Sequence, residues 1–144
     1  MQKNRRDFIC ALAVLGAVLP LAAEAHHSFS AMYDAKKPIR LSGTLRSIHW
    51  TNPHAWLELE VAGKNGDLSV WRCEGAAPGI LSSRGLAKTD IKPGDALVID
   101  GYLARSGARI IDARRIKLPD GRQIDGGSSD DGGPTSAAAK PAKS

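Results

Sequence analysis

The chain has 144 residues, 20 Lys and Arg against 15 Asp and Glu, and a formal net charge of +5. Once segments at both ends are set aside, this length allows one modest domain and excludes most folds that enclose a large cofactor. The 15 glycines and 8 prolines favour strands and turns over a helix bundle.

Residues 1–25 have the three-part pattern of an export signal. A basic start precedes an uncharged apolar run over 8–19, and the small residues Ala23 and Ala25 then mark a cleavage site. The apolar run is too short for a spanning helix. We therefore predict cleavage after Ala25 and a periplasmic or secreted protein without a stable membrane anchor.

The export route is left open by the sequence. Arg5-Arg6 followed by Phe8 resembles the twin-arginine signal, which exports folded proteins. A general secretory signal with two arginines is the alternative. On either route, the positive charge indicates a solvated surface rather than a nucleic-acid partner.

Alternating apolar and polar residues predict five strands, over residues 39–48, 54–61, 68–74, 96–103 and 109–118. Gly43 indicates a bulge or bend inside the first strand, Asn65-Gly66 predicts a hairpin turn, and 78–86 should contain a short helix.

This order predicts a mainly β protein, a small five-stranded OB-like barrel with one short helix between strands 3 and 4. An open β-sandwich is the alternative. The predicted domain covers residues 26–125. From residue 126 the composition falls to Gly, Ser, Asp, Ala, Pro and Lys, so 126–144 is predicted to be a disordered tail.

All four histidines lie between residues 26 and 54. Cleavage after Ala25 would make His26 the first residue, and its amine and ring nitrogen could chelate one copper-type ion, as in proteins with a histidine brace. His27 and His54 are the candidate partners, since a strand position is rigid. Cleavage after Ala23 would give a different copper-binding terminus, and His49 is expected only to satisfy turn carbonyls.

A second hypothesis is a metal-free interaction module that binds a partner protein or small ligand. Its candidate residues surround the Trp-Thr-Asn-Pro-His turn and the neighbouring strand, namely Trp50, Asn52, His54, Trp56 and Trp71. The alternative for the tryptophans is core packing.

We expect no enzyme, because no catalytic constellation is visible. A copper redox enzyme is the third hypothesis. Cys73 is the only cysteine beyond the predicted signal, which excludes an intramolecular disulfide in the processed chain.

Several strings resemble a family of small exported bacterial proteins of unknown function, domain of unknown function 6152. They are His26-His27-Ser28-Phe29, Leu41-Ser42-Gly43-Thr44-Leu45, Trp50-Thr51-Asn52-Pro53-His54-Ala55-Trp56, Lys92-Pro93-Gly94-Asp95 and Leu118-Pro119-Asp120-Gly121. The resemblance covers about residues 26–121. It implies an exported small β-barrel and no particular activity.

The first hypothesis is therefore a periplasmic protein that carries a copper-type ion. It would deliver the ion to an exported oxidoreductase or another periplasmic protein.

Overall fold

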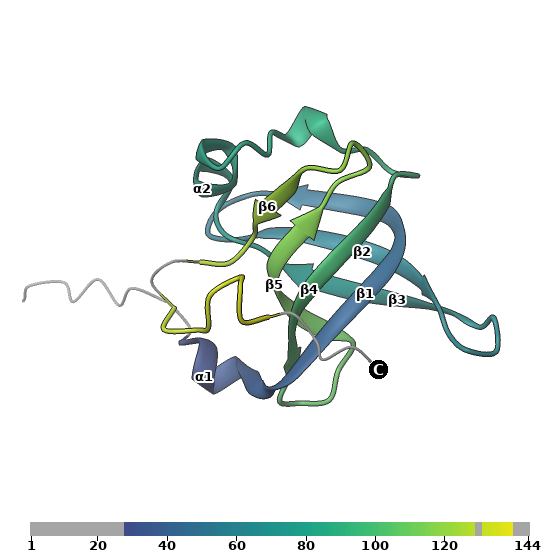
Figure 1. Ribbon diagram of the computed structural model, residues 1–144, viewed down its shortest axis with the longest axis horizontal. Coiled ribbons are helices and arrows are strands. Elements are labelled where there is room, and N and C mark those ends of the chain that lie inside the picture. The colour runs from purple at the N-terminus through teal and green to yellow at the C-terminus, as the bar shows by residue number, and fades with distance from the viewer. Residues whose placement is uncertain (1–27, 129–130, 140–144) are drawn as a thin grey trace, which may run out of the picture.

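The computed structural model describes residues 28–128 and 131–139 (Figure 1). The predicted export signal, together with His26 and His27, lies outside the described residues. The elements in chain order are α1 (Phe29–Met32), β1 (Tyr33–Trp50), β2 (Ala55–Ala62), β3 (Leu68–Glu74), α2 (Pro78–Ser83), the 3-10 turn η1 (Lys88–Asp90), β4 (Ala96–Ala104), β5 (Ile110–Lys117) and β6 (Gln123–Asp125).

The first five strands form a closed ring of hydrogen bonds. The sheet order is β3-β2-β1-β4-β5-β6, and a parallel pairing of β3 with β5 joins the two sides. All other pairings are antiparallel. The predictions of a mainly β fold and of a short helix between strands 3 and 4 are therefore confirmed, with β6 as an added sixth strand.

The long strand β1 takes part in both sides of the ring. Tyr33 and residues 38–44 pair with β4, with an irregularity between them, and residues 44–50 pair with β2. A bulge lies between Leu45 and Ser47. A Cβ at Gly43 would lie 2.5 Å from the backbone oxygen of Glu60, so only glycine allows the two strands to approach this closely. The prediction of a bend near Gly43 is confirmed, although β1 starts six residues earlier than the alternation indicated.

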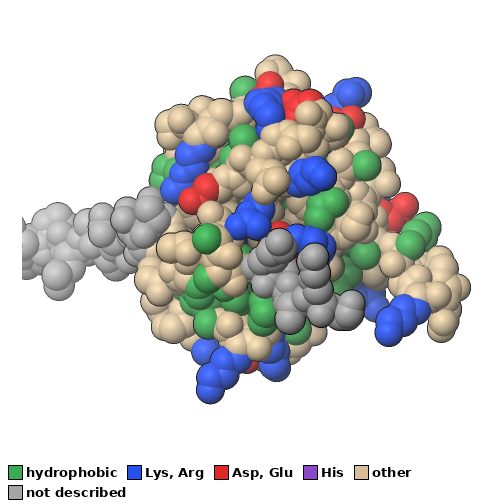
Figure 2. All heavy atoms as spheres, viewed as in Figure 1, with side chains coloured by type: hydrophobic (Ala, Val, Ile, Leu, Met, Phe, Trp, Pro, Cys, Tyr) green, Lys and Arg blue, Asp and Glu red, His purple; other side chains and the backbone are tan. Residues whose placement is uncertain are grey.

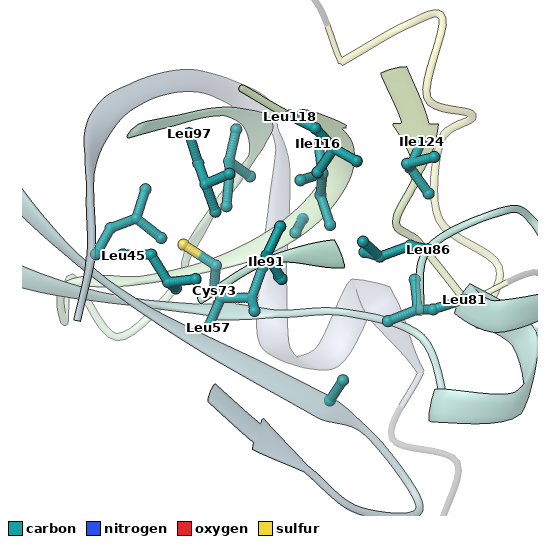
Figure 3. Close-up of a cluster of buried hydrophobic side chains, with 14 of the residues drawn as sticks. Leu45, Leu57, Cys73, Leu81, Leu86, Ile91, Leu97, Ile116, Leu118 and Ile124 are labelled. Carbon is teal, nitrogen blue, oxygen red and sulfur yellow. The ribbon is translucent and has the colours of Figure 1, made fainter. Parts of the chain in front are cut away.

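The core lies inside the ring, where the inward-facing residues of the strands meet (Figure 3). Inward and outward residues alternate along each strand except at the bulges. Leu59, Cys73, Ile99, Ile111 and Ile116 are fully buried. Leu81 of α2 and the following Leu86 belong to the same cluster and lie at one end of the ring. At about 25 cal/mol per Å² of apolar surface removed from water, this cluster provides the main stabilisation of the domain.

A second, smaller cluster lies on the outside of the ring, between α1 and the C-terminal segment 131–139 (Figure 1). Phe29 and Tyr33 pack with Tyr102, Ala104 and Ala139. The rings of Phe29 and Tyr102 meet edge to face with centroids 5.4 Å apart.

Residues 131–139 contain no helix or strand, yet the structure attaches them to the ring. The backbone oxygen of Asp131 accepts a hydrogen bond of 2.8 Å from the Phe29 amide, and Ala139 is fully buried. This differs from the disordered tail that composition predicts from residue 126. The attachment depends on a few specific contacts rather than on average hydrophobicity.

Within the described residues, no helix has the length and apolar character needed to span a bilayer.

Candidate functional site

A pocket of about 270 Å³ opens on the outer side of the ring. Its wall comes from α1, from the start of β1, the start of β2 and the end of β3, from β5 and from the C-terminal segment. The lining residues are Phe29, Met32, Tyr33, His54, Trp56, Glu74, Gly75, Asp112, Ser128 and Asp131. The size suits an ion with its ligands or a small organic molecule.

Strand register brings the polar part of this wall together. Trp56 of β2 pairs with Glu74 of β3, and Glu74 pairs with Asp112 of β5. Neighbouring residues in register point to the same face of a sheet. Because Cys73 points into the core, Glu74 points outward, and the three side chains form one row beneath α1.

His54 lies immediately before β2 and is half-buried. Its Nδ1 is 3.3 Å from the Gly75 carbonyl oxygen and 3.4 Å from Oε1 of Glu74. Both neighbours are acceptors, so Nδ1 carries the proton and donates it. Nε2 of the neutral ring therefore keeps its lone pair, which is the arrangement found in metal-binding histidines.

Glu74 is held from its other side by Tyr33. The Tyr33 hydroxyl donates a hydrogen bond to Oε2 of Glu74. Burial, reinforced by this carboxylate, raises the pKa of Tyr33 above its ordinary value of 10.0. Tyr33 therefore remains a donor at neutral pH, and the Glu74 carboxylate stays aimed at His54.

Asp112 and Asp131 flank the buried guanidinium of Arg114. Its Nε donates to Asp112, and its Nη2 donates to Oδ2 of Asp131 at 2.5 Å. The guanidinium carbon also lies 4.9 Å from the centroid of the Phe29 ring. Burial raises the pKa of Asp112, while Arg114 opposes that effect. This network fastens the C-terminal segment over the pocket.

The charge of the pocket is opposite to that of the chain. Three carboxylates, those of Glu74, Asp112 and Asp131, line it, and Arg114 compensates only part of their charge. Trp56 already holds one cation, since the guanidinium carbon of Arg72 lies 4.4 Å from its ring centroid. The wall therefore favours a cationic ligand.

The structure brings together only some of the residues predicted from sequence. His54 and Trp56 both line the pocket. Trp50 and Trp71 instead pack against the main core, which was the alternative role for the tryptophans. Asn52 is exposed in the turn. His26 and His27 lie outside the described residues, directly before Ser28 in the sequence.

His49 is exposed and pairs in register with Trp56, so it lies near the pocket without lining it. Among the described residues, no group of three or more His, Cys, Asp or Glu side chains is placed to hold a metal ion.

Sequence reasoning missed Tyr33, Glu74, Asp112, Arg114 and Asp131. Glu74 and Asp112 approach each other through the parallel pairing of β3 with β5. No local sequence pattern predicts that pairing. Asp131 lies in a segment whose composition is that of a disordered tail. One ion pair could have been predicted from the sequence. Asp112 and Arg114 are two residues apart in a predicted strand, so their side chains must lie on the same face.

Comparison with known proteins agrees with the resemblance seen in the sequence. The model of a family of unknown function, DUF6152, matches residues 14–111, from within the predicted export signal to the start of β5. A search of curated proteins finds no match. Because the match spans well over half of the chain, the protein belongs to the DUF6152 family, whose function is unknown.

Proposed function

We propose that the protein is an exported binding protein that holds a copper-type ion in the pocket beside His54, for carriage or delivery. The observation that carries this proposal is the orientation of His54. Its Nδ1 faces the Gly75 carbonyl and Glu74, at 3.3 and 3.4 Å, which leaves Nε2 as the ligand atom. Imidazole is a preferred ligand for copper and zinc.

The remaining ligands in this proposal come from the processed N-terminus. His27 adjoins Ser28 in the sequence, and Phe29, the next residue, forms part of the pocket wall. Successive Cα atoms are about 3.8 Å apart, so the proposal requires the chain before Ser28 to turn toward this entrance. The His26 amine and ring with His54 Nε2 would complete a nitrogen set that suits Cu(II).

The acidic wall supports the same proposal. Glu74, Asp112 and Asp131 place negative charge around the pocket and stabilise a bound cation. Met32, 43% exposed at the rim, offers a thioether that suits Cu(I). A carrier that exchanges its ion with an exported oxidoreductase, or another periplasmic partner, needs such an accessible site.

The test is a copper titration of the processed protein against a competing chelator. We expect His54→Ala to weaken copper binding at least about tenfold, which corresponds to the loss of one ligand. His49→Ala is the matched control, since His49 lies in β1 just before the same turn but does not line the pocket. Equal affinities for the His54→Ala variant and the wild type would overturn the proposal.

A second test addresses the N-terminal ligand. One extra residue before His26 displaces the amine and should weaken copper binding as His54→Ala does. Unchanged affinity in the extended protein would remove the amine from the ligand set.

The aromatic part of the wall favours one second candidate, a metal-free module that binds a small ligand or a partner protein. Phe29, Tyr33 and Trp56 form a partly buried aromatic side of the pocket. In that case Trp56→Ala should abolish ligand capture, while His54→Ala and the N-terminal extension should leave it intact. Retained capture in Trp56→Ala would exclude this candidate.

A further inference from the structure

A second pocket lies on the outer face of β1, β4, β5 and β6 and has the opposite charge. Its volume is about 390 Å³. Its polar lining residues are Arg40, Ser42, Asp100, Arg115, Lys117 and Gln123. None of them lines the pocket beside His54. In Figure 2, Lys and Arg side chains gather over the centre of the face on which β4, β5 and β6 lie.

Strand register builds this pocket in two adjacent rows. Arg40 of β1 pairs with Asp100 of β4, which pairs with Arg115 of β5. Two residues along, the next row continues across all four strands and consists of Ser42, Val98, Lys117 and Gln123. Residues two apart share a face, so both rows point away from the core.

The single acid of the pocket lies beneath its cations. Asp100 is only 3% exposed and accepts hydrogen bonds from Nε and Nη2 of Arg40, at 2.6 and 2.9 Å. Nη1 of Arg115 lies 3.8 Å from the same carboxylate. The carboxylate thus holds the Arg40 guanidinium and attracts that of Arg115, whose Nη2 donates to the Ser136 backbone oxygen at 2.6 Å. Lys117 adds a third, exposed cation.

We propose that this pocket binds a doubly charged oxyanion, a phosphate or sulfate group. Three cations over one carboxylate leave an excess of two positive charges, which matches such a group. Guanidinium and ammonium groups are the donors that bind it best. Ser42 and Gln123 add neutral donors at the wall. The volume exceeds that of a single phosphate and leaves room for the molecule that bears it.

The test is a titration followed by backbone amide chemical shifts, at constant ionic strength maintained with chloride. The probes are inorganic phosphate, inorganic sulfate and glycerol phosphate. We expect saturable shifts confined to β1, β4, β5 and β6 around these rows. Tighter binding of glycerol phosphate would assign a phosphate ester, and equal binding would assign the free ion. Either result supports the site.

Lys117→Gln should weaken phosphate binding at least about threefold, because it removes a charged donor from an exposed position. Lys64→Gln is the matched control, with the same charge change in the exposed turn between β2 and β3. It should leave affinity within about twofold of the wild type. Non-saturable shifts, or equal losses in the two variants, would show that phosphate only screens surface charge and would overturn the proposal.

Discussion

Replacement of Gly101 by Ala should separate two strands that support the pocket beside His54. A Cβ at residue 101 would lie 2.0 Å from the backbone oxygen of Asp112 and 3.0 Å from its carbonyl carbon. Nonbonded heavy atoms pack best at about 3.5–4.0 Å, so β4 and β5 would have to part by more than about 1 Å. Both contacts are backbone atoms, which cannot rotate away as a side chain can.

The expected loss of stability is large for a single methyl group. Overpacking alone costs about 1–3 kcal/mol. Each hydrogen bond weakened between β4 and β5 adds about 1 kcal/mol. We therefore expect Gly101→Ala to lower the free energy of unfolding by about 3 kcal/mol or more, a large part of the roughly 5–15 kcal/mol available.

Urea denaturation of the variant and the wild type measures this loss. Gly79→Ala is the matched control, because Gly79 lies in α2 and nothing lies within 4 Å of its Cβ position. Alanine is favoured over glycine in helices, so Gly79→Ala should stabilise the protein by about 0.5–1 kcal/mol. A free energy of unfolding for Gly101→Ala within about 0.5 kcal/mol of the wild type would show that β4 and β5 accept the methyl group without separating.

Four further predictions concern buried groups and their partners. Asp131→Asn weakens one of the two ion pairs of Arg114 and should increase amide hydrogen exchange in residues 131–139 at least about tenfold; unchanged exchange would show that the segment is held by other contacts. Leu59→Ala empties a fully buried position and should cost about 2–5 kcal/mol in urea denaturation; a cost below about 1 kcal/mol would contradict the core described above. Burial raises the pKa of the Cys73 thiol, so an aromatic disulfide reagent should react with it only after unfolding; fast labelling of the folded protein would show that the ring opens readily. Burial also raises the pKa of Asp112 above its ordinary value of 3.8, so the folded state binds that proton more tightly than the unfolded chain does. The resulting stabilisation is complete below that ordinary value and is lost as pH rises through the pKa of the folded state. Urea midpoints measured across this range should therefore decline less with pH in Asp112→Asn than in the wild type, and parallel curves would argue against a raised pKa.

Local sequence patterns predicted the strands well where one face of the strand is buried and the other faces solvent. Leu57 and Leu59 alternate with half-buried residues in β2, and β3 spans the residues that alternation indicated. The turn at Gly66, with φ of 82°, is one that a glycine makes without strain. The start of β1 was missed because residues 34–37 are mostly polar and exposed, and only Tyr33 and Pro38, on either side of them, pair with β4.

The candidate site was only half visible in the sequence. His54 and Trp56 stood out because they lie beside a distinctive turn. Their partner Glu74 depends on a hairpin register and on a parallel pairing between strands separated by more than thirty residues, and neither has a local signature. The attachment of Asp131 was hidden for another reason, since one charged contact can hold a segment that lacks apolar residues.

Native mass spectrometry of the protein exported to a periplasm, and purified without added metal, shows whether the protein holds copper. One spectrum reports both the processed N-terminus and any bound ion. We expect a chain that starts at His26 and carries one copper ion, and His54→Ala should lose that ion while His49→Ala keeps it. A chain that starts at His26, carries no metal and retains none after copper is offered and a chelator is washed through would rule out the copper carrier.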